Sequence, residues 1–366
     1  FPVADGQSIE FKLSGGTGDA DMYVNYNDRP ASRDDYERVS GAADSNESVR
    51  YEAALAGVYH VLLHAFTDFS GTTLTVTTGL AVLPYNIELV FINAGTSTQN
   101  AAFTGAATRW EALLPIDITD IPFLNQPVEA NSACGSSFQH PPIEDTVDDL
   151  RIFADIIEID GPGGTLGQAG PCLIRSSSGL PVVGFMQFDE ADLANLEAQG
   201  RLGSVILHEM GHVLGIGTVW GPGGADLLRD PSFGNPGQDT HFVGPLAIQA
   251  FEDAGGLLYG GQKVPVENSG VAGSTDGHWR EIVMLLELFT PTLNAGFNPL
   301  SAISVQSLAD VGYRVDATAA DAYTITLPAA AAAAAPGPVI DLGGDIWRGP
   351  LMEVDGQGRI IRVIRR

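Results

Sequence analysis

The sequence predicts a multidomain protein with a small antiparallel β domain, an α+β domain after it and an irregular C-terminal tail. Short alternating segments separated by glycines fill residues 1–79, which is typical of a β-sandwich. Residues 85–326 mix helical and strand patterns without a repeating βα unit, and periodicity is lost after them. The 44 glycines and 22 prolines divide the chain into short elements and argue against an all-helical bundle.

The excess of acidic over basic residues limits the kinds of molecule that the protein is expected to bind. With 45 acidic and 18 basic residues the formal net charge is −27, which repels phosphate backbones and excludes nucleic acid as an expected partner. No apolar run reaches the ~18 residues that a membrane-spanning helix requires. The chain begins at Phe1 without a leader pattern, so we expect a secreted protein whose signal or pro-segment has been removed. The sequence leaves the oligomeric state open.

Five strands are expected in the first domain, each with alternating polar and apolar residues. They are Ser8–Leu13, Asp21–Tyr26, Ser48–Ala53, Val58–Ala65 and Thr72–Thr77.

Three stretches of this domain, Gly18–Val24, Ala56–Leu63 and Phe69–Leu74, resemble the bacterial pre-peptidase C-terminal domain. The resemblance implies a secreted bacterial β-sandwich that accompanies an extracellular protease in an accessory role. Some members of that family bind calcium, which makes Asp19 and Asp21 candidate Ca²⁺ ligands; the alternative is that both are ordinary turn carboxylates.

A short linker, 80–84, leads to the α+β domain. A helix is expected over Asn100–Leu114, where Pro115 ends it, and another over Glu190–Ala198, where Gly200 follows. The expected strands of this domain are Tyr85–Asn93, Asp148–Ile159 and Pro181–Phe188.

Residues 327–366 are expected to form a linker and a basic tail. Seven alanines, Ala329–Ala335, precede Pro336-Gly337-Pro338, a composition typical of a linker. The tail then holds five of the 18 basic residues: Arg348, Arg359, Arg362, Arg365 and Arg366. A final hairpin, a removable tail and a docking patch all fit this pattern, and a loosely attached tail is the expectation.

The segment Leu202–Leu214 carries the chemistry. It is expected to be a helix containing His208-Glu209-Met210-Gly211-His212. Because residues i and i+4 lie one turn apart on the same helix face, both imidazoles can reach one Zn²⁺ ion. Glu209 lies beside them, where it can act as the general base on a metal-activated water.

A catalytic zinc site needs a third protein ligand and an open position for water. Gly215 allows a sharp turn after the helix, so the third ligand is expected downstream. The residues alone leave His241, His278 and the carboxylate of Glu252 as candidates. The other histidines, His60, His64 and His140, are expected at the surface.

Residues 82–326 resemble the leishmanolysin-type metzincins, and in particular their secreted bacterial relatives. The resembling pieces are Phe242–Pro245, Val264–Asn268, His278–Glu281, Glu287–Thr290 and Ser307–Tyr313. That family has a long insertion between the second and third zinc histidines, and here 66 positions separate His212 from His278. The resemblance implies that His278 is the third ligand, that the fold is metzincin-like and that the protein is a zinc endopeptidase acting on proteins or peptides.

One position departs from the family pattern. The family has a methionine in a tight turn beneath the zinc, and this chain has Phe289 there. A hydrophobic floor is what that position requires, so an aromatic ring is expected to serve. The rival hypothesis is a secreted, non-catalytic adhesion or binding protein with a structural zinc, in which Phe289 marks lost activity. Glu209 favours the enzyme, since a purely structural site has no use for an acid there.

The remaining expectations concern supporting groups. Glu267, Asp276 and Glu281 are three equivalent candidates for a carboxylate that orients a ligand imidazole. Tyr313 is expected in the core or at the surface rather than at the oxyanion. Cys134 and Cys172 are expected to pair because a secreted protein meets an oxidising environment; two buried free thiols are the alternative.

Overall fold

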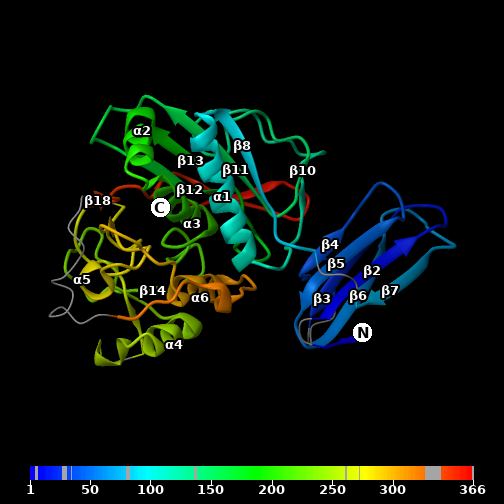
Figure 1. Ribbon diagram of the computed structural model, residues 1–366. Helices are drawn as coiled ribbons and strands as arrows, with labels where there is room; N and C mark the ends of the chain where they lie inside the picture. The colour runs from blue at the N-terminus through cyan, green and yellow to red at the C-terminus, as the bar shows by residue number, and fades with distance from the viewer. Residues whose placement is uncertain are drawn as a thin grey trace.

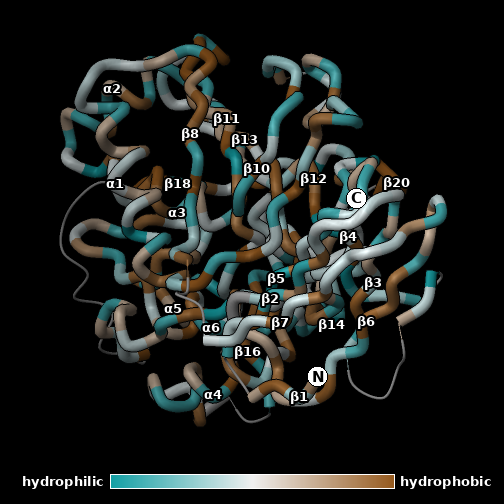
Figure 2. The backbone as a smooth tube through the Cα atoms, turned by 90° about the vertical axis from the view of Figure 1, so that its right-hand side faces the viewer, coloured by the Kyte–Doolittle hydropathy of each residue, from teal (hydrophilic) through white to brown (hydrophobic). Residues whose placement is uncertain are grey.

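The protein is seen in a computed structural model that describes residues 1–4, 7–26, 31–33, 35–79, 83–135, 138–259, 262–271, 273–325 and 339–364. Figure 1 shows a smaller, all-strand domain at the N-terminus and a larger domain that contains all the helices. Figure 2 follows the hydropathy of the chain through the same elements in a perpendicular view. None of the helices in the described ranges is long and apolar enough to cross a membrane.

The N-terminal domain consists of two antiparallel sheets. One has the strand order β1-β6-β3-β4 and the other β5-β2-β7. Ile9, Phe11 and Leu13 alternate along one strand and are fully buried, as the period of two predicts. The strands are β1 (Pro2–Val3), β2 (Gln7–Ser14), β3 (Ala20–Tyr26), β4 (Arg38–Ser40), β5 (Glu47–Ala54), β6 (Gly57–Ala65) and β7 (Thr73–Thr78).

The larger domain is built on a six-stranded mixed sheet with the order β20-β19-β12-β13-β11-β8. Strands β8, β11 and β13 run parallel, and β12 is antiparallel to β13. The central strands β11 and β13 are buried along nearly their whole length and are mostly apolar, as strands buried on both faces usually are, whereas β8 at the edge of the sheet is half-buried. The bounds are β8 (Ile87–Asn93), β11 (Leu150–Ile157), β12 (Gly167–Arg175), β13 (Pro181–Asp189), β19 (Leu351–Val354) and β20 (Ile360–Ile364).

Three helices cover this sheet: α1 (Ser97–Leu113), α2 (Glu190–Ala198) and α3 (Leu202–Leu214). A capping box formed by Thr96 and Gln99 starts α1. The indole Nε1 of Trp110 on α1 donates to the Leu207 carbonyl on α3 at 3.1 Å, which joins the two helices. Because α3 is buried along most of its length, it lies between the sheet and the rest of the domain.

Below α3 the domain consists of short elements joined by long loops (Figure 1). They share one hydrophobic core with α1 and α3. The strands are β14 (Leu228–Arg229), β15 (His241–Phe242), β16 (Val264–Pro265), β17 (Thr292–Leu293) and β18 (Ile340–Asp341). Two other short strands, β9 (Ile121–Pro122) and β10 (Thr146–Val147), pair with each other and pack in a separate core with residues of β11, β12 and β13. The helices are α4 (Pro245–Asp253), α5 (Glu281–Met284) and α6 (Ala302–Val311), with 3₁₀ turns at Gly256–Tyr259 and Ala317–Ala319.

The C-terminus corrects one expectation. Residues 339–364 are not an irregular tail, because β19 adds to the sheet parallel to β12 and β20 pairs with β19. The reason is apolar surface: Leu351, Met352 and Val354 are buried against the sheet. The strand β12 was also missed, since its glycines and proline obscure its pattern. The alanine-rich linker, residues 80–82 of the first linker, Arg365 and Arg366 lie outside the described residues.

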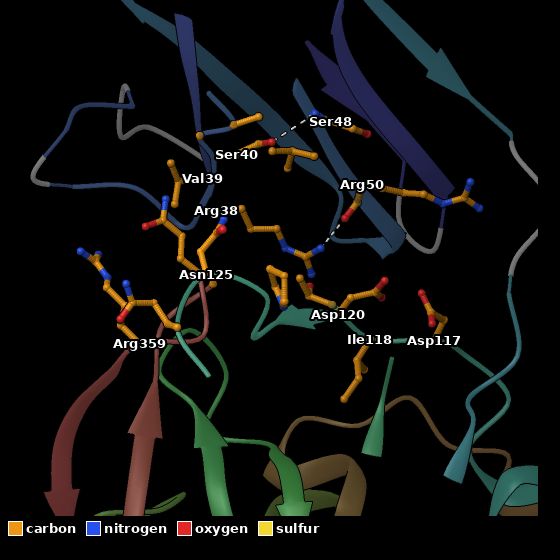
Figure 3. Close-up of a pocket in the computed structure, with 18 of the residues that line it drawn as sticks. Arg38, Val39, Ser40, Ser48, Arg50, Asp117, Ile118, Asp120, Asn125 and Arg359 are labelled. Atoms are coloured by element: carbon orange, nitrogen blue, oxygen red, sulfur yellow. Dashed lines mark hydrogen bonds between the residues drawn. The ribbon is translucent and has the colours of Figure 1, made fainter. Parts of the chain in front are cut away.

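A cavity of about 620 Å³ lies where the two domains meet (Figure 3). Arg38, Ser48 and Arg50 line it from the N-terminal domain, and Asp117, Asp120 and Arg359 are among the residues that line it from the larger domain. None of the histidines predicted to bind metal lines this cavity.

Candidate metal centre

The helix α3 carries the first two histidines of the centre. His208 and His212 are fully buried, and their Nε2 atoms are 2.9 Å apart, as the one-turn spacing predicts. The helix ends at Leu214, and Gly215 follows with a φ of 123°, so the predicted turn is present. Gly217, with a φ of 72°, then passes so close to Gly277 that a Cβ atom would lie 1.9 Å from the Gly277 carbonyl oxygen.

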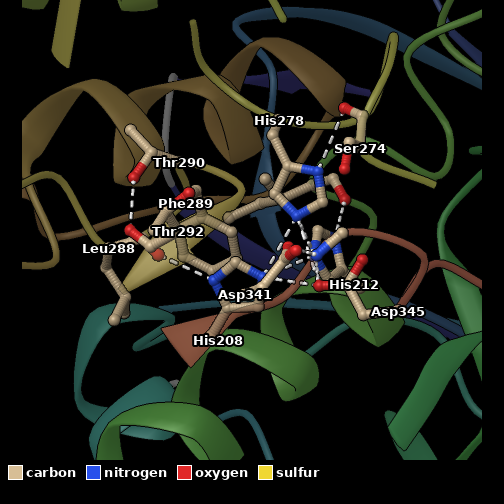
Figure 4. A network of polar contacts seen from close by, with 12 residues as sticks. His208, His212, Ser274, His278, Leu288, Phe289, Thr290, Thr292, Asp341 and Asp345 are labelled. Atoms are coloured by element: carbon tan, nitrogen blue, oxygen red, sulfur yellow. Dashed lines mark hydrogen bonds and ion pairs between the residues drawn. The ribbon is translucent and has the colours of Figure 1, made fainter. Parts of the chain in front are cut away.

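That close approach brings in the third histidine. His278 is fully buried, and its Nε2 lies 3.2 Å from that of His208 and 3.1 Å from that of His212 (Figure 4). The backbone around it is held on two sides, since Glu267 N donates to the His278 carbonyl and Trp279 N donates to the Phe289 carbonyl, each at 2.8 Å. Three imidazoles from distant parts of the chain therefore converge on one point.

Each ring is oriented by a backbone carbonyl. Nδ1 donates to Leu288 O in His208 (2.7 Å), to Ile216 O in His212 (2.8 Å) and to Ser274 O in His278 (3.3 Å). A carbonyl only accepts, so Nδ1 carries the proton and the Nε2 lone pair faces the centre. The carboxylates considered for this task have other partners: Glu267 accepts from Ser269, Asp276 from the backbone N–H of Ser232, and Glu281 from Asn294.

The donor set fits zinc. In a tetrahedral site with Zn–N bonds of about 2.0–2.1 Å, neighbouring donor atoms are about 3.3 Å apart. The three Nε2 atoms lie 2.9–3.2 Å apart, within a few tenths of that value. Burial lowers the pKa of His208 to about 4 and also lowers the pKa of His212, which keeps both imidazoles neutral as metal ligands must be.

A fourth member of the cluster, Asp345, was not predicted from the sequence. Its side chain is 4% exposed, and its Oδ2 lies 3.0 Å from Nε2 of His208, 3.3 Å from that of His278 and 3.6 Å from that of His212. Burial alone would raise the pKa of Asp345, but the three imidazoles hold it well below its usual range. Conversely, burial would lower the pKa of His278, but the Asp345 carboxylate raises it. One signal was available in the sequence: Ile346, Leu351 and Met352 follow Asp345, an apolar pattern typical of a packed segment.

Glu209 lies within the same buried region. It is fully buried, and neither carboxyl oxygen has a hydrogen-bond partner among the described residues. Burial, together with the nearby Asp345 carboxylate, raises the pKa of Glu209 well above its ordinary value. A buried carboxyl without a partner is unfavourable for folding, which makes Glu209 a candidate for chemistry rather than for structure.

Phe289 packs directly against two of the histidines. Its ring is parallel to that of His208, with 4.9 Å between centroids, and perpendicular to that of His212 at 5.6 Å. The turn before it includes Leu285 at a φ of 48° and is anchored by the buried Glu287 carboxylate. That carboxylate accepts from Phe289 N and from the hydroxyls of Ser301 and Ser304 at 2.6–2.7 Å.

The other candidates lie elsewhere. His241 is on β15 and its Nδ1 pairs with the Asp239 carbonyl, while Glu252 is on α4. The expectation for His140 was wrong, because the ring is buried against Phe153 and its Nε2 accepts from Ala133 N at 3.0 Å.

Three further expectations can be compared with the structure. Tyr313 is a core residue whose hydroxyl donates to the Leu214 carbonyl at 3.0 Å. The disulfide between Cys134 and Cys172 is confirmed. Among the described residues, the clusters compact enough to hold a metal are the His208, His212, His278 and Asp345 group and the carboxylates of Asp117, Asp148 and Asp149; neither contains Asp19 or Asp21.

Comparison with known proteins gives matches to named bacterial proteases. A zinc metalloprotease of Helicobacter pylori and a hemagglutinin/proteinase of Vibrio cholerae are each 38% identical over 76 residues, and a neutral protease of Vibrio proteolyticus is 31% identical over 74 residues. Each match covers 20% of this chain, in the N-terminal domain, and the chain spans 28% of the length of the first relative and 12% of the other two. These matches do not include the histidine cluster. Residues 1–65 match the family described as bacterial pre-peptidase C-terminal domain, so the N-terminal β-sandwich is a domain of that family.

Proposed function

We propose that the protein is a secreted bacterial zinc endopeptidase of the leishmanolysin-like metzincin type. His208, His212 and His278 would hold the Zn²⁺, and Glu209 would be the general base. One observation carries the proposal: three Nε2 atoms converge at 2.9–3.2 Å beside a buried carboxyl that has no hydrogen-bond partner among the described residues. The pre-peptidase C-terminal domain and the named protease relatives support an extracellular peptidase independently of the site.

The mechanism follows from the positions of these groups. A zinc ion held there would supply Lewis acidity to a water molecule and to the scissile carbonyl. Glu209 would accept the proton of the attacking water and then return it to the leaving amine nitrogen. The backbone carbonyls of Leu288, Ile216 and Ser274 keep the imidazoles in one tautomer throughout. Phe289 excludes water from the face of the His208 ring.

The rival is a non-catalytic binding protein with a structural zinc. One observation favours it: Asp345 completes a set of four protein donors, and closed four-ligand sites are typical of structural zinc. Glu209 argues against this rival, because in a structural zinc site its buried carboxyl would have no function and no hydrogen-bond partner among the described residues.

Bound zinc and casein hydrolysis would be measured together in the parent chain, Glu209→Gln and Glu190→Gln. Glu190 is an exposed glutamate at the start of α2 and serves as the matched control. We expect about one zinc per chain in all three proteins, with hydrolysis at least about 100-fold lower in Glu209→Gln than in the other two. A parent chain that binds no zinc would refute the proposal. If the parent bound zinc but did not hydrolyse casein, two explanations would remain: a catalytic centre that is closed, or a centre that is not catalytic. The Asp345 variants described below distinguish these two explanations.

A further inference from the structure

The Asp345 carboxylate fills the fourth corner of the histidine cluster. Oδ2 lies 3.0–3.6 Å from the three Nε2 atoms, which themselves lie 2.9–3.2 Å apart (Figure 4). Four donors at such spacings approach the corners of the tetrahedron that zinc prefers, whose edges are about 3.3 Å. The carboxylate therefore lies in the position that a catalytic site keeps open for water and substrate.

Outside the histidine cluster, the side chain of Asp345 has no hydrogen-bond partner among the described residues. Oδ1 makes no hydrogen bond within the described residues, and the partners of Oδ2 are the three imidazoles. Burying a carboxylate costs several kcal/mol unless a cation or strong hydrogen bonds compensate. The backbone of this residue is held separately, since Ala169 N donates to the Asp345 carbonyl at 2.9 Å. The loop is thus fixed by its backbone and presents its carboxylate to the metal position.

The segment that carries Asp345 also contacts the loop that carries His278. A Cβ atom on Gly273 would lie 2.4 Å from the Cα of Gly344, so the two backbones touch. Arg348 donates to the Thr275 carbonyl at 2.8 Å. Farther along, β19 pairs with β12, and β20 forms the outer edge of the sheet. The segment 339–364 therefore contacts both the loop that carries His278 and the six-stranded sheet.

We propose that Asp345 is a fourth metal ligand and that the segment 339–364, by delivering it, holds the centre in a closed state of low activity. This inference rests on the proposed zinc site. A closed state accounts for the presence of the candidate general base, Glu209, in a centre where Asp345 occupies the position expected for water. Opening requires that Oδ2 leaves the metal, and no hydrogen bond of the side chain to a described residue outside the cluster opposes this.

The test compares the parent chain, Asp345→Ala, Asp345→Asn and the control Glu353→Gln. Glu353 is a carboxylate of the same segment, on β19, whose partner is Arg362 rather than the cluster. The proteins would be loaded with Co²⁺, and binding of acetohydroxamate, a small bidentate metal ligand, would be followed by visible absorption. Zinc release to a chelator and casein hydrolysis would be measured on the zinc forms.

We expect Asp345→Ala to bind acetohydroxamate about tenfold more tightly than the parent or better, which corresponds to a parent with at most about one open centre in ten. Its Co²⁺ spectrum should differ from that of the parent before the probe is added, its zinc should be released faster, and casein hydrolysis should rise by a similar factor. Asp345→Asn keeps the size of the side chain but is a weaker ligand, so it should lie between the two. Glu353→Gln should match the parent.

Other outcomes are equally informative. Equal probe binding and equal spectra in the parent and Asp345→Ala would overturn the inference while leaving the zinc peptidase proposal intact. An increase in Glu353→Gln as large as in Asp345→Ala would assign the effect to loosening of the segment and overturn the ligand role. Tighter probe binding in Asp345→Ala without casein hydrolysis would support the fourth ligand and refute the peptidase. Absence of bound metal from every variant would refute both.

Discussion

The two sides of the metal centre are built in different ways. On one side, His208 and His212 come from a single helix, and helix geometry alone sets their separation. On the other side, His278 and Asp345 come from loops that are 70 and 137 positions from His208. The helix side is local and was predicted from sequence spacing. The loop side depends on tertiary packing, so substitutions far from the metal position can disturb the loop side more easily than the helix side.

Replacing one histidine from each side compares the two directly. Zinc affinity should fall by at least about 100-fold in both His212→Ala and His278→Ala, since losing a group that merely supports a ligand already costs about 10- to 100-fold. Competition with a chromophoric chelator measures the affinity. His241→Ala, a histidine outside the cluster, should bind zinc like the parent. Retention of normal affinity by His278→Ala would mean that the loop side contributes no third histidine.

The loop side has its own anchor, Glu287, whose anchoring role was not predicted from the sequence. Glu287→Ala should lower the free energy of unfolding by about 3 kcal/mol, because it leaves the buried N–H of Phe289 and two buried serine hydroxyls without their acceptor. Chemical denaturation of the metal-free protein measures this. Glu287→Gln keeps one acceptor oxygen and should lose less. If Glu287→Ala were as stable as the parent, the Phe289 turn would be held by packing alone.

Asp189 combines local and distant contacts in one carboxylate. It caps α2 through Ala191 N and also accepts from the N–H groups of Ile159, Asp160 and Gly161. Burial alone would raise the pKa of Asp189, but these backbone N–H groups lower it to about 2. A carboxyl whose pKa is lower in the folded than in the unfolded state stabilises the fold above pH ~4 and loses that contribution as the pH falls to 2, here about 2 kcal/mol. Unfolding free energies at pH 5 and pH 2.5 should therefore differ less in Asp189→Asn than in the parent. An unchanged difference would refute this role.

The smallest effect is expected for Phe289→Met, which restores the residue of the family resembled. Swaps between apolar side chains of comparable size usually cost less than about 1.5 kcal/mol, and zinc should remain bound. The Co²⁺ spectrum should shift slightly, because the parallel contact with the His208 ring is lost. Thermal unfolding and bound zinc measure both points. A loss of zinc would show that the aromatic ring positions His208.

Sequence patterns predicted some parts of the molecule well. The strands β2 and β3 alternate buried and more exposed positions over most of their length, and α2 and α3 have the predicted bounds. Asp345 was missed because its place depends on β19 pairing with a strand about 180 positions earlier, and a glycine-rich strand such as β12 gives no clear alternation. The orienting groups on the histidines were missed for a related reason. They are backbone carbonyls, and because every residue has one, the residue types do not indicate which carbonyl accepts the hydrogen bond.

The contact between Gly217 and Gly277 has a consequence for the mutational tolerance of the chain. Gly217 contributes no side chain to the centre, yet even alanine there would collide with a carbonyl and face an unfavourable backbone conformation. In a saturation mutagenesis screen scored by zinc retention, this position should be as intolerant as His208. Such a screen would identify it as essential although it binds nothing, because its task is to leave room for the chain that delivers His278.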